Sequence, residues 1–255
     1  MEAVYDQVGH SYVATRQPDP RIAAAIRAAL GEVHTVLNVG AGTGSYEPTD
    51  LQVAAVEPSL AMLHQRPAGT APVIQAVAEH LPWPDTAFDA TLAILTVHHW
   101  SDRAAGLAEL RRVARHRIVL LTWDPAYRDA FWLTTRYVPE VVAFDVPRFP
   151  SMTELACCLG RIEAQPLRIP HDCQDGFLGA FWRRPEAYLD PNVRRAMSGF
   201  AQLPPEVVHA GLARLAADLR SGQWDAQFGW VRDQTSFDLG YRLIIAPGSI
   251  HYDLL

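Results

Sequence analysis

The chain has 255 residues, of which 49 % are hydrophobic and 20 % charged, a balance typical of a globular protein with a substantial core. Its formal net charge of −6 disfavours nucleic acid as the main partner, because phosphate binding needs a basic surface. All 22 Lys+Arg residues are arginine, and the missing lysine excludes Schiff-base catalysis, a Walker-A phosphate loop and the Tyr-x-x-x-Lys pair of short-chain dehydrogenases.

The sequence contains no apolar run of the ~18 residues that are needed to cross a bilayer. Its first ten residues lack a basic stretch followed by an apolar one, so we expect no signal peptide, no membrane partner and a cytoplasmic location. The three cysteines, Cys157, Cys158 and Cys173, fit no metal-ligand spacing. We therefore expect reduced thiols and no metal site.

The first half of the chain alternates short β-branched runs with helical patterns, which predicts βαβ units around a parallel sheet. In chain order the predicted elements are helix 22–30, strand 35–39, strand 53–56, helix 59–65, strand 73–77, strand 88–95, helix 102–115 and strand 117–122. Residues 45–52 are few and include Pro48, so the first crossover helix must be short or irregular.

The pattern loosens in the second half. Residues 126–160 form a predicted lid region, in which the Pro-rich stretch 138–150 is a loop and 153–159 a short helix. A sixth strand is expected over 161–169 and a seventh over 240–246. The residues between them, 171–239, are too many for a connector and include predicted helices over 185–197 and 204–220. We expect one domain, 1–255, with 171–239 as a substrate cap or a subunit interface.

A glycine-rich loop follows the first predicted strand. Gly40, Gly42 and Gly44 form Gly-x-Gly-x-Gly, a pattern that lets a backbone approach a ligand closely and offers free amide groups. The dinucleotide fingerprint would place its third glycine at Ser45 and therefore fails. Glu57 ends the second strand, where a carboxylate beside the loop can accept both hydroxyls of a ribose.

Three segments in this order, VLNVGAGTG, AAVEPS and AEHLPWPDTAFDATLAILTVHHW, resemble the class I methyltransferases that depend on S-adenosylmethionine (SAM). The nearest in appearance are the small-molecule methyltransferases of the ubiquinone/menaquinone and sugar O-methyltransferase type. The resemblance covers roughly residues 1–125. It implies an α/β, Rossmann-like fold with a seven-stranded, mostly parallel sheet, helices on both faces, a late antiparallel strand and a helical insertion between strands six and seven.

The resemblance also implies SAM as the cofactor, S-adenosylhomocysteine (SAH) as its product, and a set of cofactor-binding residues. Carried over by position, these are Tyr12, Arg16, Gly40, Ala41, Gly42, Thr43, Glu57, Pro58, Ala78, Glu79 and Thr96. Asn38 departs from the family pattern, because an acid is usual just before the first glycine. The amide weakens the expected hold on the methionine ammonium of the cofactor.

Candidate catalytic residues stand at strand ends, where α/β sheets place their reacting groups. His98 and His99 follow the fourth strand, and Asp124 follows the fifth. A histidine can deprotonate a hydroxyl or an amine, and the aspartate can orient a histidine or bind the acceptor. For each of the three a structural role is an open alternative, such as capping a helix or forming an Asp-Pro turn.

Four residues are candidates for acceptor binding. Trp100 and Trp123 fall near the predicted site, where aromatic walls suit a flat apolar or sugar-bearing acceptor. His171 and Asp172 open the insertion, and we interpret them as a polar loop at the substrate mouth rather than as metal ligands.

The leading hypothesis is methyl transfer from SAM to an oxygen or nitrogen atom of a small molecule, by in-line displacement with possible His or Asp base assistance. A second hypothesis is a protein that binds SAM or SAH without transferring the methyl group, as a sensor or an aid to another reaction. A nicotinamide-dependent oxidoreductase is disfavoured by Ser45 and by the missing lysine. The expected partner is a small-molecule substrate, with no nucleic acid, and the protein is a monomer or a homodimer.

Overall fold

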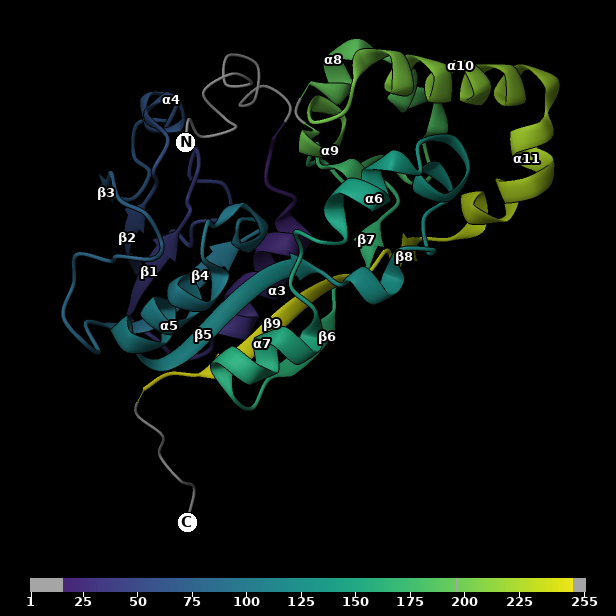
Figure 1. The fold of residues 1–255 in the computed structure, drawn as a ribbon. Coiled ribbons are helices and arrows are strands. Elements are labelled where there is room, and N and C mark those ends of the chain that lie inside the picture. The colour runs from purple at the N-terminus through teal and green to yellow at the C-terminus, as the bar shows by residue number, and fades with distance from the viewer. Residues whose placement is uncertain (1–15, 196, 250–255) are drawn as a thin grey trace.

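A seven-stranded sheet forms the centre of the molecule (Figure 1) in the computed structural model, which describes residues 16–195 and 197–249. The strand order is β3-β2-β1-β4-β5-β9-β6. All neighbours are parallel except β9, which runs antiparallel to β5 and β6. The strands are β1 Thr35–Val39, β2 Gln52–Val56, β3 Val73–Ile74, β4 Phe88–Ile94, β5 Ala114–Trp123, β6 Glu163–Pro166 and β9 Tyr241–Pro247. The predicted fold class is confirmed.

Alternate residues of the central strands face opposite sides of the sheet, and each side is covered by helices. Leu37 of β1 packs with helices α5 (Arg103–Val113) and α7 (Met152–Leu159). Its neighbour Val36 packs on the other side, with helix α3 (Pro20–Leu30). Burial on both faces explains why β1, β4 and the part of β5 from Ile118 onward are rich in apolar residues.

The helices of the sheet half begin at side-chain caps that the sequence displays. Asp19 accepts a hydrogen bond from the Arg21 amide before α3, and Asp102 accepts one from the Ala105 amide before α5. Ser59 caps the short helix α4 (Leu60–His64) in the same way. The described residues 40–51 between β1 and β2 form turns and no helix, so the expectation of a short or irregular crossover there is confirmed.

The second half builds a separate lobe, seen at the upper right of Figure 1 beyond the ends of β5 and β9. We call residues 125–150 and 169–239 the cap. Its α-helices are α6 Glu140–Asp145, α8 Pro191–Arg194, α9 Ser198–Ala201, α10 Pro205–Ser221 and α11 Gln223–Phe228. Its 3-10 and π-helical turns are Pro125–Tyr127, Leu133–Tyr137, Leu178–Phe181, Pro185–Leu189 and Gly229–Asp233. Strands β7 Ile169–Pro170 and β8 Ser236–Phe237 form a small second sheet.

Several predicted elements of this half are wrong in detail. The sixth strand, predicted over 161–169, is split into β6 in the main sheet and β7 in the small one. The predicted helix 185–197 is broken, because Asp190 caps a new helix that starts at Pro191. The predicted loop 138–150 contains the helix α6.

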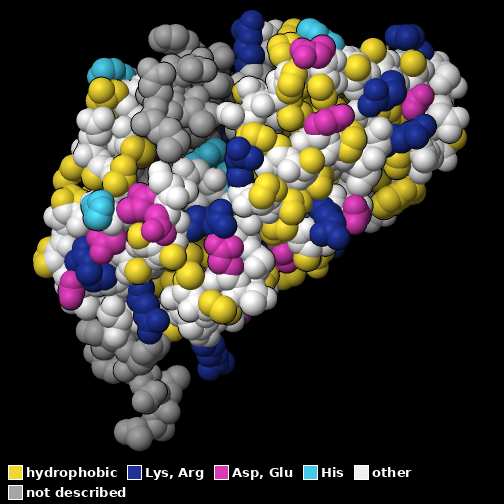
Figure 2. Space-filling model, in the orientation of Figure 1, with side chains coloured by type: hydrophobic (Ala, Val, Ile, Leu, Met, Phe, Trp, Pro, Cys, Tyr) yellow, Lys and Arg dark blue, Asp and Glu magenta, His cyan; other side chains and the backbone are white. Residues whose placement is uncertain are grey.

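On the face shown in Figure 2, basic and acidic side chains are interspersed rather than gathered into one basic patch. Among the described residues, no helix is long and apolar enough to span a membrane.

Candidate functional site

The larger of two adjoining cavities, with a volume of about 260 Å³, lies at the ends of β1, β2 and β4. We call it the glycine-loop cavity. Ten of the residues predicted to bind a cofactor line it, namely Arg16, Gly40, Ala41, Gly42, Thr43, Glu57, Pro58, Ala78, Glu79 and Thr96. The eleventh, Tyr12, lies outside the described residues. The structure thus brings together groups that are spread over 80 positions of the sequence.

Two glycines of the loop are required for different reasons. Gly40 has φ +70°, and a β-carbon there would overlap the side chain of Thr96, so only glycine fits. Gly42 has φ +53°, and no protein atom lies within 4 Å of the position of a β-carbon. Because Gly42 lines the cavity, a side chain there would occupy space that is open to a ligand.

Glu57 fixes the loop from the neighbouring strand. Its side chain is only 5 % exposed, and its two oxygens accept hydrogen bonds from the amides of Gly42 (2.7 Å) and Ser59 (2.9 Å). Carboxylate oxygens have further lone pairs, so the group can still accept from a ligand that enters the cavity.

Asn38 offers a second acceptor to the same cavity. Its amide nitrogen donates to Oε1 of Glu47 (3.2 Å), while its Oδ1 is buried and finds no donor among the described residues. A buried acceptor without a partner is costly, and a ligand with a positively charged donor would satisfy it. Glu47 is held in turn by Arg66 through two bonds of 2.7 and 2.9 Å, and Arg66 also donates to the Gly42 carbonyl (3.2 Å).

Sequence reasoning missed Glu47 and Arg66, which form a buried ion pair behind the loop. They are 19 positions apart and match no motif. The only local signal is a charged residue in each of two otherwise irregular segments.

The smaller cavity, of about 90 Å³, lies between the sheet and the cap, and we call it the cap cavity. Arg16 and Leu95 line both cavities, so the two adjoin there. Leu95 follows β4 with φ +49°, a conformation that is rare for a leucine and that marks the junction as a strained point. Six aromatic side chains line the cap cavity, namely Trp123, Tyr127, Phe131, Phe149, Phe177 and Tyr241.

The two candidate histidines face different cavities. His98 lines the cap cavity, and its ring stacks on Phe149 at 3.9 Å between centroids. Burial, reinforced by His99 and by two nearby arginines, holds the pKa of His98 well below its usual value, so its imidazole is neutral near pH 7. His99 lines the glycine-loop cavity instead, as does Trp100.

The third candidate catalytic residue, Asp124, lies outside the residues that line either cavity. Its carboxylate accepts from the Ala126 amide (3.0 Å) and caps the turn that starts at Pro125. This is the structural alternative of an Asp-Pro turn. Trp123, one residue earlier, does line the cap cavity, and its indole donates to the Leu239 carbonyl (2.9 Å).

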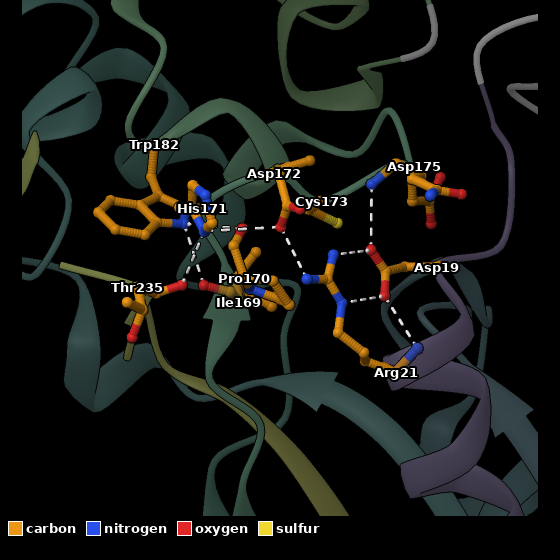
Figure 3. Close-up of polar contacts among 12 residues, drawn as sticks. Asp19, Arg21, Ile169, Pro170, His171, Asp172, Cys173, Asp175, Trp182 and Thr235 are labelled. Carbon is orange, nitrogen blue, oxygen red and sulfur yellow. Dashed lines mark hydrogen bonds and ion pairs between the residues drawn. The ribbon is translucent and has the colours of Figure 1, made fainter.

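His171 and Asp172 also lie outside both cavities, at the start of the cap (Figure 3). His171 Nδ1 is 3.2 Å from the Thr235 carbonyl oxygen, and Asp172 forms an ion pair with Arg21 (2.7 Å). The same arginine binds Asp19, which lowers the pKa of that carboxyl to about 2. The polar loop is therefore a joint between the cap and the start of α3.

A buried part of this joint reaches both cavities. Asp175 is 1 % exposed and accepts hydrogen bonds from Arg16 Nε (2.6 Å) and from the Tyr46 hydroxyl (2.9 Å). Burial and the Asp175 charge raise the pKa of Tyr46, so its hydroxyl keeps its proton. The network joins the residue at the meeting point of the cavities to the glycine loop and to the cap.

Comparisons with known proteins point to one family. The family model described as "Methyltransferase domain" matches residues 37–121. A solved structure from Anabaena variabilis ATCC 29413, described as "Putative methyltransferase from antibiotic biosynthesis pathway", is 36 % identical, with 91 % of this chain and 98 % of that chain covered and a TM-score of 0.84.

Two further likenesses are narrower. "Uncharacterized protein YafE" of Escherichia coli (strain K12) is 38 % identical over 66 residues, which are 24 % of this chain and only 31 % of that relative's length. The structure of geranyl diphosphate C-methyltransferase from Streptomyces coelicolor A3(2), in complex with Mg²⁺, geranyl diphosphate and SAH, is 15 % identical, covers 89 % of this chain and 77 % of its own, and has a TM-score of 0.50.

Proposed function

Because the chain belongs to the class I SAM-dependent methyltransferases, we propose that it methylates an oxygen or nitrogen atom of a small molecule held in the cap cavity. The cofactor, SAM, follows from the family. The observation that carries the proposal is the contact between two unlike cavities at Arg16 and Leu95. One is lined by the glycine loop and by the acceptor side chains of Asn38 and Glu57, and the other has aromatic walls, as a cofactor and an acceptor with an apolar body require.

The residues of the glycine-loop cavity fit SAM. Glu57 would accept hydrogen bonds from the two ribose hydroxyls, and the unpaired Oδ1 of Asn38 would accept one from the methionine ammonium. The open space at Gly42 would admit the cofactor against the backbone, and Ala78 with Glu79 would border its adenine. When bound, SAM supplies an electrophilic methyl group on a sulfonium.

The protein's part in the reaction is to position the acceptor and to keep water out. In-line displacement needs the nucleophilic atom about 3 Å from the methyl carbon and on the axis of the breaking bond. Aromatic walls from β5, β9 and the cap would hold the apolar body of the acceptor. His98 lines this cavity with a neutral imidazole and would be the group that takes the proton lost by the nucleophile, but its lowered pKa makes it a weak base, so positioning of the acceptor carries most of the reaction.

The test is turnover with a panel of small phenols, alcohols and amines. The purified protein is incubated with SAM, and mass spectrometry follows SAH and the acceptor with one added methyl group. We expect at least one acceptor to produce both, His98→Gln to lose turnover while it retains SAM binding, and Asp124→Asn to keep turnover. SAM binding with no acceptor-dependent SAH across the panel would favour the second hypothesis, a SAM-binding protein that does not transfer the methyl group.

A further inference from the structure

Asp145 is the single carboxylate among the described residues that line the cap cavity. It ends helix α6, and a β-carbon on Gly199 of α9 would lie 3.8 Å from its Oδ2. Two cap helices thus meet at this side chain. Sequence reasoning did not select Asp145, and the proposed cofactor and methyl-transfer roles do not use it.

The Asp145 carboxylate has no partner among the described residues that would neutralise its charge. Arg148, one turn further on, lies 3.5 Å over the Phe144 ring and donates to the Phe144 carbonyl (2.8 Å). Arg16, which lines the same cavity, is paired with Asp175. An ionised carboxylate in such surroundings is costly unless a ligand supplies the opposite charge.

Partial burial at this cavity raises the pKa of Asp145 to about 6, with only the Arg148 charge acting in the other direction. The group is therefore ionised at pH 7. A cationic ligand would offset the free-energy cost of the partly buried carboxylate charge. The aromatic rings of the cavity would also attract a cation through their π faces. The other cation at the cavity, Arg128, is 58 % exposed and lies 3.8 Å from Asp129, so it does not compensate Asp145.

We propose that Asp145 recognises a positively charged nitrogen of the acceptor, so that the substrate class is an amine-bearing small molecule with an apolar or aromatic body. The inference rests on the proposed function, because it takes the cap cavity as the acceptor site. It names a group that anchors the acceptor, and the anchored nitrogen is distinct in principle from the atom that receives the methyl group.

The test is direct binding to the SAH-loaded protein, measured by isothermal titration with probes that differ only in charge. 2-Phenylethylamine and 2-phenylethanol have similar shapes, and tryptamine with tryptophol gives a larger pair. We expect each amine to bind wild type about 10–100-fold more tightly than its alcohol, the range of a charge-assisted hydrogen bond. Asp145→Asn keeps the volume of the side chain and should abolish the preference.

The matched control is Glu140→Gln, which removes a charge from the exposed first turn of the same helix and should leave the preference intact. Thermal melts confirm that both variants fold. Equal binding of amine and alcohol, no binding of either amine, or a preference that survives Asp145→Asn would overturn the inference. SAH binding is titrated first, and its absence in wild type would contradict the proposed function. A failure of the proposed function is thereby distinguished from a failure of the Asp145 inference.

Discussion

The sheet half and the cap are stabilised by different kinds of interaction. In the sheet half, backbone ladders between β1, β2, β4 and β5 fix the strands, and aliphatic side chains fill both faces. The cap has short elements and is tied by side chains that reach backbone carbonyls. Trp132 donates to the Trp182 carbonyl (2.8 Å), and Trp182 donates to the Ile169 carbonyl (3.0 Å). The sheet half is thus held by regular backbone pairing, whereas the stability of the cap depends on particular large side chains.

The same division separates the two cavities. The glycine-loop cavity has polar groups at strand ends within residues 37–121, the stretch that matches the methyltransferase family model, together with Arg16. The cap cavity shares Arg16, draws its other lining residues from Leu95 to Tyr241 and includes six aromatic side chains. In our account the sheet half supplies the reaction and the cap selects the acceptor. Each of the following predictions tests that division of roles.

The largest expected effect is on the cap core. Trp182 is fully buried, and Trp182→Ala should lower the free energy of unfolding by about 3–5 kcal/mol, because a large cavity opens and hydrogen bonds are lost. Trp230 is the matched control, since it packs on the same Phe237 ring but is 53 % exposed, and Trp230→Ala should cost less than about 1 kcal/mol. Urea titration measures both. Comparable losses would contradict the cap core described here.

The joint between the regions comes next. Asp175→Asn removes the buried carboxylate charge that pairs with Arg16 and should cost about 3 kcal/mol. Asp172→Asn, three residues earlier, breaks an exposed pair with Arg21 and should change stability far less, because solvent screens that pair. Both values come from chemical denaturation at pH 7. If the two variants were equally stable, the joint would not couple cap and sheet.

Glu57→Gln tests whether the glycine-loop cavity of the sheet half binds the cofactor. The change keeps the shape of the side chain but replaces a charged acceptor of the Gly42 and Ser59 amides, so SAM affinity should fall about 100-fold. Asp145→Asn, in the cap cavity, should change SAM affinity less than about 3-fold. Isothermal titration reads both, and a large loss in the second variant would mean that the cavities are not separable.

The smallest expected effect is a gain in stability on replacing Asp145. Because the folded protein raises the pKa of Asp145 from 3.8 to about 6, ionisation of this group opposes folding, and the penalty grows as the pH rises from 3.8 to 6 and is constant above. Asp145→Asn should therefore unfold at a higher temperature than wild type at pH 7, by about 1 kcal/mol in stability, with little difference at pH 4. Calorimetry at the two pH values tests this, and a loss of stability at pH 7 would show that Asp145 has a partner.

Elements of the sheet half were predictable because each carries its signal locally. Gly40 and Glu57 stand at strand ends, and Asp102 precedes its helix, so neighbouring residues alone indicate their places. The short β3 is the exception, since the predicted strand 73–77 continues only to Ile74.

The cap was not predictable in the same way. Asp145 lies in the predicted loop 138–150. Its place at the cap cavity depends on packing against Gly199, 54 positions later. His171 and Asp172 were predicted at the substrate mouth, but their partners Thr235 and Arg21 hold them at the joint. Long-range contacts of this kind leave no periodic or motif signal in one sequence.

The central claim, that the sheet half holds SAM or SAH at the glycine loop, is tested most directly by titrating wild type, Gly42→Ala and Gly69→Ala with SAH and with NADH. Gly42 and Gly69 both have positive φ and open space for a β-carbon, but only Gly42 lines the glycine-loop cavity. We predict that SAH binds wild type and Gly69→Ala alike, that Gly42→Ala binds it at least about 10-fold more weakly, and that NADH binds none of them. Binding of NADH, or unchanged SAH affinity in Gly42→Ala, would contradict the account.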